Sequence, residues 1–335
     1  MNVVYASNDN YARHLAVSLY SLLDHNRDLN DIHVYVLSMG LSGVTKERLK
    51  TVTDEFGRKL TIMELGDLKA RFSYKVDTGG FDLSIMARLF VGEVLPEETS
   101  RILYLDCDTV VLSSLKNLWE TDLKSSLLGA VMEPTIYPSI KEEIGLLPSE
   151  PYYNSGVLLI DMNRWKKENA QKMLLDFYCA KGGKLFAGDQ DTINGALKGR
   201  IKPLSPRYNF FTNYRYYRYS HLIRLSPVYK IITKKSFEEA KRRPVILHFM
   251  GDERPWKEGN LNHYRKAYET YLSRTPWAGT PKENGSRLYM AAYHLMDYAT
   301  FLCPPVRDFV SRRFGMQVIN SRKNVQKETG QKEKA

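Results

Sequence analysis

Cysteine is scarce in this sequence, whose 335 residues include only Cys107, Cys179 and Cys303. The three lie far apart, show no metal-ligand spacing, and would leave one thiol over if any two paired. These features argue against a disulfide framework and favour a reducing compartment. The apolar run at residues 2–5 is too short for the core of a signal peptide, so no export signal is predicted.

Long hydrophobic runs are also missing. The most apolar late segment, residues 288–306, contains His294, Asp297 and two prolines, which makes it a poor bilayer span. We therefore expect a cytoplasmic protein that can lie peripherally on the inner face of the membrane.

Acidic residues are too few to balance the basic ones. The chain has 49 Lys and Arg against 38 Asp and Glu, a formal net charge of +11, which favours anionic partners such as nucleotides, anionic lipid or nucleic acid. Residues 282–334 hold ten basic and five acidic residues and so supply +5 of that charge. Aromatic residues lie among the arginines of residues 286–316. This pattern suits either contact with an anionic membrane surface or a helix packed on the rest of the protein.

Internal repeats and Gly/Ser-rich linkers are absent from the first 275 residues. The composition, 43% hydrophobic, is sufficient for a substantial core. We therefore predict one domain over residues 1–275, a basic aromatic helical extension over 276–320, and a disordered polar tail over 321–335.

Short apolar runs alternate with helical patterns, which is typical of an α/β sheet that is largely parallel. The first three apolar runs cover residues 2–6, 32–37 and 60–65, and the helical patterns after them cover 11–25, 45–56 and 84–95. Later strand candidates are residues 127–131, 155–160 and 245–249.

The apolar run at residues 101–112 is broken by two carboxylates, Asp106 and Asp108. On a strand, side chains at i and i+2 face the same side, so both carboxylates would point to one place. Two such charges repel unless a cation lies between them, and their oxygens suit Mg²⁺ or Mn²⁺ with substrate phosphates completing the shell. The D-x-D pattern alone is a weak signal, but apolar runs on both sides argue against a solvated surface pair.

Two more polar clusters follow predicted strands or begin predicted helices, and open α/β sheets bind ligands beyond the carboxyl ends of their strands. Residues 7–11 open the first helix, where they could cap it or bond a base or ribose. Residues 188–191 begin another helix, where Asp189 or Asp191 could also be an ordinary cap.

The last cluster, residues 248–256, is more informative. His248 follows an apolar run directly, and Gly251 and Arg254 come soon after it. The imidazole could bind the metal, the glycine would let a phosphate approach the backbone, and the guanidinium offers a phosphate fork. A histidine buried at a strand end is the structural alternative.

Taken in order over residues 1–275, these clusters resemble glycosyltransferase family 8, which includes glycogenin and bacterial lipooligosaccharide galactosyltransferases. The resemblance implies a GT-A fold, a mostly parallel central sheet flanked by helices. It also implies transfer of a hexose, glucose or galactose, from a UDP-sugar with retention of anomeric configuration, with Mn²⁺ or alternatively Mg²⁺ as cofactor. The acceptor would be a glycan, glycolipid or glycoprotein, as in polysaccharide biosynthesis.

The resemblance also assigns residues. Asn8 stands where the family usually has Asp, Glu133 stands where Asp is expected, and Cys107 is a backbone and packing residue between the metal ligands. The implied metal ligands are Asp106, Asp108 and His248. The implied donor-binding residues are Ala6, Asn8, Asn10, Tyr11, Arg88, Asp106, Cys107, Glu133, Asn154, Ser155, Gly251 and Arg254.

The implied catalytic residues are Asp189 and Gln190, which would stabilise an oxocarbenium-like state as dipoles beside the anomeric carbon. The metal and Arg254 would offset charge on departing UDP. A short-lived covalent intermediate and attack from the face that UDP leaves both fit these residues.

Two other classes of function fit parts of the sequence. The stretch around Asp106 also resembles the strand end of HAD-type phosphatases, in which the first Asp is a nucleophile, but that class does not account for residues 7–11 or 248–256. Residues 213–243 carry nine Lys or Arg against two Asp or Glu with interleaved tyrosines, which fits a nucleic-acid surface or a polar acceptor groove. A nucleic-acid partner is the less favoured of the two.

Overall fold

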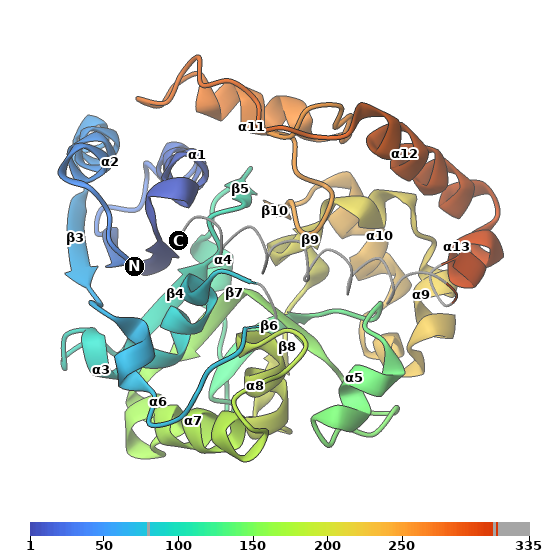
Figure 1. Cartoon of the computed structure of the whole chain (residues 1–335), viewed down its shortest axis with the longest axis horizontal. Helices are drawn as coiled ribbons and strands as arrows, with labels where there is room; N and C mark the ends of the chain where they lie inside the picture. Colours follow the sequence, from blue (N-terminus) through green and yellow to red (C-terminus); the bar gives the residue numbers. More distant parts are fainter. Residues whose placement is uncertain (79–80, 311–312, 314–335) are drawn as a thin grey trace.

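A computed structural model describes residues 1–78, 81–310 and 313 (Figure 1). A seven-stranded sheet runs through it in the order β3-β2-β1-β4-β7-β6-β8. Only β7 is antiparallel to its neighbours in this sheet, so the largely parallel sheet expected from the sequence is confirmed. The strands are β1 (Asn2–Ser7), β2 (His33–Ser38), β3 (Lys59–Glu64), β4 (Arg101–Leu105), β6 (Leu128–Met132), β7 (Tyr153–Asp161) and β8 (Ile201–Pro203).

A second, three-stranded sheet carries the order β5-β10-β9. Its strands are β5 (Thr109–Val111), β9 (Phe210–Phe211) and β10 (Ile246–His248). Strand β10 runs antiparallel to β5, with His248 opposite Thr109, and parallel to β9. This pairing brings the end of β10 beside the turn that leads into β5.

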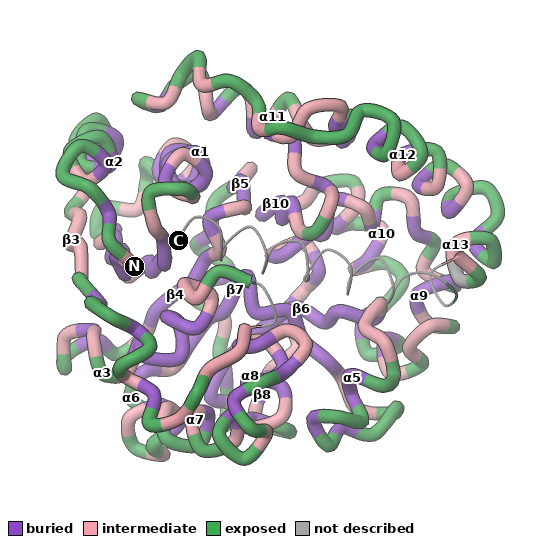
Figure 2. Tube along the Cα trace, in the orientation of Figure 1, coloured by how far each residue is buried: buried purple, intermediate pink, exposed green. Residues whose placement is uncertain are grey.

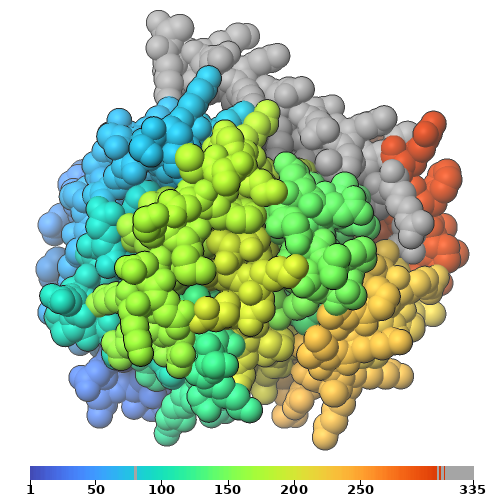
Figure 3. All heavy atoms as spheres, turned by 90° about the horizontal axis from the view of Figure 1, so that it is seen from below, coloured from blue at the N-terminus to red at the C-terminus, as the bar shows by residue number. Residues whose placement is uncertain are grey.

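Helices cover both faces of the central sheet (Figure 1). One side has α1 (Ala12–Asp24), α2 (Gly43–Glu55) and α11 (Arg265–Leu272), and the other has α3 (Val91–Val94), α6 (Met162–Lys167), α7 (Ala170–Ala180) and α8 (Asp189–Ala196). Figure 3 views the molecule from the side of α7, which lies there beside the segment containing α5 (Pro138–Glu143). The other helices are α4 (Lys116–Trp119), α9 (Tyr219–Leu225), α10 (Lys234–Arg242), α12 (Arg287–Leu302) and α13 (Pro304–Val310), and the 3-10 helices are η1 (Asp9–Tyr11), η2 (Leu68–Arg71), η3 (Leu83–Phe90), η4 (Pro206–Tyr208), η5 (Thr212–Tyr216) and η6 (Pro227–Ile231).

The core lies between the sheet and these helices, as the buried central strands in Figure 2 show. Leucines of α1 that recur at helical spacing, among them Leu15 and Leu19, are fully buried. In β4, Ile102, Leu103 and Leu105 are fully buried too, as expected of a strand packed on both faces. The buried end of β4 therefore supports the turn that follows it.

The prediction that Asp106 and Asp108 lie on one strand is wrong. Strand β4 ends at Leu105, and the two carboxylates lie in the turn before β5. Asp106 N still donates a hydrogen bond of 2.8 Å to Gly156 O on β7, and Thr109 Oγ1 donates one of 2.8 Å to Asp106 O. These bonds fix the turn in place of a continuous ladder.

The extension predicted after residue 275 contains α12 and α13, while the tail predicted over residues 321–335 lies outside the described residues. Among the helices that the structure describes, none has the length and apolar character needed to cross a membrane.

Candidate active site

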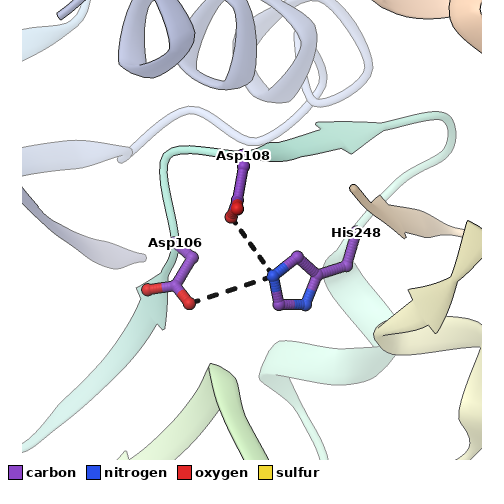
Figure 4. A group of neighbouring side chains, drawn as sticks. All are labelled: Asp106, Asp108 and His248. Carbon is purple, nitrogen blue, oxygen red and sulfur yellow. Dashed lines mark ion pairs between the residues drawn. The ribbon is translucent and has the colours of Figure 1, made fainter. Parts of the chain in front are cut away.

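Three predicted metal ligands meet at one point. Figure 4 shows that Asp106 and Asp108, from the turn between β4 and β5, and His248, from the end of β10, face one another. One ligand atom from each lies within 4.8 Å of the others. His248 Nε2 is 3.2 Å from Asp108 Oδ1 and 3.9 Å from Asp106 Oδ2. Two carboxylates and an imidazole are a donor set that suits Mn²⁺ or Mg²⁺, so these residues fit a divalent cation.

The other nitrogen of the imidazole is held by a buried asparagine. His248 Nδ1 lies 2.9 Å from Asn209 Oδ1, and because an amide oxygen can only accept, Nδ1 carries the proton. Asn209 Nδ2 in turn donates to Asn154 Oδ1 at 2.8 Å. In the neutral ring this leaves the Nε2 lone pair facing the two carboxylates, as ligation requires.

Charges in the cluster shift one another's pKa. Burial and the charge of Asp108 raise the pKa of Asp106, although Arg88 opposes this. Burial alone would raise the pKa of Asp108, but His248 and Arg254 lower it. Burial alone would lower the pKa of His248, whereas Asp108 raises it. A cation at this point would take the place of a proton on His248 Nε2. It would also relieve the repulsion between the two carboxylates.

Arg88 joins the metal-ligand cluster to the predicted catalytic pair. It comes from η3, and its guanidinium bonds Asp106 Oδ1 at 2.7 Å, Asp189 Oδ2 at 3.0 Å and Ser155 O at 2.5 Å. Arg88 and Asp189 are both buried, 4% exposed each. Burial raises the pKa of Asp189 to about 6, against the effect of Arg88. Removing the Arg88 guanidinium would take away the ion-pair partner of buried Asp189 and of partly buried Asp106, which is destabilising.

The amide of Gln190 is fully hydrogen-bonded. Its Oε1 accepts from Asn154 Nδ2 at 2.9 Å and Ser155 N at 3.0 Å, and its Nε2 donates to Glu133 Oε2 at 3.1 Å and Tyr152 OH at 3.0 Å. Asn154 Nδ2 also donates to Glu133 Oε2 at 3.0 Å, and burial raises the pKa of that carboxyl. Such a network holds the dipole of the amide in one orientation.

The predicted nucleotide loop lies at the end of β1. Asn8 caps η1 by accepting from Tyr11 N at 3.2 Å, and it donates to Asp82 Oδ2 at 2.9 Å. Asn10 is exposed, while burial raises the pKa of Tyr11 to about 12 against the charge of Arg254. The structure thus assigns Asn8 a capping role and leaves contact with a nucleotide as a prediction.

The remaining predicted residues have clear surroundings. The Cys107 thiol is buried and donates to Ala6 O at 3.2 Å, so it packs beneath the turn as expected. Gly251 adopts φ +65°, a left-handed conformation that glycine tolerates, and Trp256 from the same loop packs on His14 in the core. Arg254 Nε is buried and has no hydrogen-bond partner within the described part of the chain.

Sequence reasoning missed several residues of this site. Asn209 lies outside every predicted motif, and no local pattern marks it, whereas Tyr152 lies beside Asn154 and Ser155 in the sequence but was assigned no role. Gly156 was quoted within a strand but given no role. A Cβ there would lie 2.4 Å from His248 Cε1, which no side chain tolerates. A lone glycine inside an apolar strand was the signal that could have identified it, because such glycines mark a close approach.

The interleaved tyrosines of residues 213–243 do not form an exposed stacking surface. Tyr214, Tyr217 and Tyr229 are buried, from 0% to 5% exposed, and they pack around η5, α9 and η6. Stacking on single-stranded nucleic acid needs exposed rings. The tyrosine pattern therefore reflects packing in the core.

Two known proteins are similar in sequence to most of this chain. General stress protein A of Bacillus subtilis (strain 168) is 28% identical over 289 residues, 85% of this chain and 98% of that protein. The lipopolysaccharide 1,2-glucosyltransferase of Escherichia coli (strain K12) is 23% identical over 282 residues, 83% of this chain and 79% of that protein.

Among solved structures, the galactosyltransferase LgtC in complex with donor and acceptor sugar analogs superposes with a TM-score of 0.69 at 25% identity. The match covers 82% of this chain and 96% of that one. The GT-A fold expected from the resemblance is therefore confirmed. Residues 2–259 match the model of glycosyl transferase family 8, and this range includes every residue of the site described above. The chain belongs to glycosyl transferase family 8.

Proposed function

We propose that this protein is a retaining glycosyltransferase that moves a hexose, glucose or galactose, from a UDP-sugar to a glycan, glycolipid or glycoprotein acceptor. The observation that carries the proposal is the cluster of Asp106, Asp108 and His248, with the fixed amide of Gln190 linked to it through Asn154 and Asn209. A metal–diphosphate site next to an oriented dipole is the arrangement that departure of UDP from a sugar requires.

Asp106, Asp108 and His248 would hold Mn²⁺, or Mg²⁺ in its place. When bound, the ion would supply positive charge to the leaving diphosphate. Arg254 would add a second positive group, which is supported by a buried Nε that has no partner in the described residues. Together these charges would favour breaking the bond between the sugar and UDP.

Asp189 and Gln190 would act at the sugar. Both lone pairs of Gln190 Oε1 already accept hydrogen bonds, which supports a role as a fixed dipole near the oxocarbenium-like carbon. Asp189 would keep Arg88 and the Ser155 hydroxyl in position through bonds of 3.0 Å and 2.9 Å. Family membership favours this chemistry over the phosphatase alternative for Asp106.

The direct test is UDP release by the purified full chain from a panel of UDP-sugars, with Mn²⁺ and with EDTA. We expect release from one donor, a loss of at least about 100-fold in EDTA, and recovery when Mn²⁺ is added back. GDP- and ADP-sugars serve as matched controls. Absence of release from every donor, together with Mg²⁺-dependent cleavage of a generic phosphate ester, would move the assignment to the phosphatase.

We also propose that the C-terminal helices attach the enzyme to an anionic membrane surface. Leu288, Leu295, Leu302 and Phe309 recur every seven residues, and each is 68% to 84% exposed. They are exposed side chains of α12 and α13, two helices that Figure 2 shows at the rim of the molecule, while polar His294 and Asp297 are buried. An outward apolar face next to the exposed Arg287 and Arg218 suits insertion among anionic lipids.

The double variant Leu295→Asp with Leu302→Asp should bind phosphatidylglycerol-containing vesicles more than about tenfold more weakly than the native chain. Each leucine contributes on the order of 1.5 kcal/mol or more when it leaves water for the lipid. Co-sedimentation measures this. The matched control is Val44→Asp on α2, where Val44 is 63% exposed. Equal vesicle binding by the double variant and the native chain would contradict the attachment, and so would equal binding to neutral vesicles.

A further inference from the structure

The loop after β10 is fastened to helix α12. The Tyr289 hydroxyl on α12 donates a hydrogen bond of 3.0 Å to Asp252 Oδ2, and His294 Nε2 accepts one of 2.8 Å from Leu261 N. Asp252 also accepts through its backbone oxygen from Asn260 Nδ2 at 2.8 Å. Asp252 is therefore held both by its own loop and by the C-terminal helix.

The segment just before α12 pairs with the same loop. Glu283 N donates to Trp256 O at 2.8 Å, and Glu258 N donates to Glu283 O at 2.9 Å. The Glu283 carboxylate pairs with Arg13 and lies 3.4 Å from His14 Nε2 on α1. Burial alone would raise the pKa of Glu283, but its bonds to His14 and Arg13 lower it to about 2. The loop is thus enclosed between α1 and the C-terminal segment.

A buried carboxylate marks the inner side of this contact. Glu253 is 1% exposed, and its Oε2 accepts from Asn262 Nδ2 and, at 3.3 Å, from Thr212 Oγ1. Burial and the nearby charge of Asp297 on α12 raise its pKa to about 7. Buried polar groups of this kind cost stability and, when bonded, restrict a segment to one conformation.

Arg254 follows these residues directly. Its positive charge is close enough to Asp108 to lower the pKa of that metal-ligand carboxyl, and its buried Nε has no hydrogen-bond partner among the described residues. The position of this guanidinium therefore depends on the backbone of Asp252 and Glu253.

We infer that Tyr289 and Asp252 are positioning residues for the donor diphosphate, because their hydrogen bond holds the loop in the conformation that presents Arg254. The inference rests on the proposed function, in which Arg254 binds the leaving diphosphate. Because both residues would act through Arg254 and not on the reacting atoms, replacing either one should weaken donor binding. The side of α12 that contacts the loop thereby serves the active site through a solvent-accessible hydrogen bond, since Tyr289 is 38% exposed.

The test is steady-state UDP release by the full chain carrying Tyr289→Phe, which keeps the ring and removes the hydroxyl. We expect the donor KM to rise about five- to tenfold with kcat within about twofold, because the loss falls on binding. Asp252→Ala should match it, Asp252→Asn should restore part of the affinity, and the double variant Tyr289→Phe with Asp252→Ala should be no worse than either alone. The control is Tyr74→Phe, which loses a hydroxyl bond of 2.9 Å to Leu175 O elsewhere.

The outcomes separate this inference from the proposed function. No UDP release by the native chain would refute the function, and the positioning role with it. Native turnover with an unchanged donor KM in Tyr289→Phe would refute only the positioning role. A fall in kcat with a melting temperature lowered as in Tyr74→Phe would mean that the contact is merely structural, which also overturns the inference.

Discussion

Replacing Asp108 with Asn is expected to lower the rate of UDP release about 1000-fold, a loss of roughly 4 kcal/mol of transition-state stabilisation. Asp108 is the carboxylate nearest His248, 3.2 Å from Nε2, and an amide is a poor ligand for Mn²⁺ in its place. Its side chain makes no ion pair with Arg88, whereas Asp106 does. The substitution therefore removes a ligand and leaves the Arg88 network intact.

Two measurements distinguish ligand loss from misfolding. Direct titration with Mn²⁺ should show affinity reduced by at least about tenfold. In EDTA the melting temperature should change little, because losing the His248 contact and relieving repulsion with Asp106 oppose each other. Asp54→Asn, an exposed carboxylate paired with Lys50, is the matched control. Mn²⁺-dependent turnover that persists at the native rate in Asp108→Asn would end the metal role of this residue.

The three residues of the candidate metal site could be predicted from the sequence because each lies in a local pattern. Asp106 and Asp108 interrupt an apolar run and His248 ends another, so polarity marked them as candidates, and the family resemblance grouped them into one ligand set. The strand geometry proposed for the carboxylates was wrong, since they lie in a turn. They still converge, because β10 pairs with β5 and returns His248 to that turn.

Pairing between distant segments explains what could not be predicted. Asn209 belongs to the residues just before β9, and it meets His248 only because β9 and β10 pair in parallel. Arg88 was predicted to contact the donor, and the structure shows it bonded to Asp106, Asp189 and Ser155. Hydrogen-bond partners so distant in sequence leave no periodic signal along the chain, whereas apolar alternation does.

The orientation of α12 shows a second limit. Its composition suggested one amphipathic segment that either packs on the protein or meets a membrane. In the structure the polar His294 and Asp297 face inward while Leu288 and Leu295 are exposed. Hydrophobicity alone would orient such a helix the other way. Bonding partners for the buried polar groups, Leu261 N for His294 and Arg307 for Asp297, make this orientation stable.

Gly156→Ala is expected to be the most damaging single-methyl substitution near the site. The added Cβ would lie 2.4 Å from His248 Cε1 and 2.9 Å from Asp106 Oδ2, so at least one ligand must move. Gly156 does not adopt a left-handed backbone conformation, so space alone requires the glycine here. Overpacking of this kind costs about 1–3 kcal/mol of stability. Displaced ligands should reduce Mn²⁺ affinity about 10- to 100-fold.

Activity should fall further than stability, because a displacement near 1 Å at reacting groups costs about 100-fold in rate. UDP release at saturating Mn²⁺, an Mn²⁺ titration and a thermal melt together measure the three effects. Gly43→Ala at the start of α2 is the matched control, since a Cβ there meets nothing within 4 Å. If Gly156→Ala binds Mn²⁺ like the native chain, His248 and Asp106 do not need their present spacing, and the three-ligand site is wrong. If both affinity and rate fall while the control stays native, the close approach of β7 to the metal ligands is part of the catalytic site.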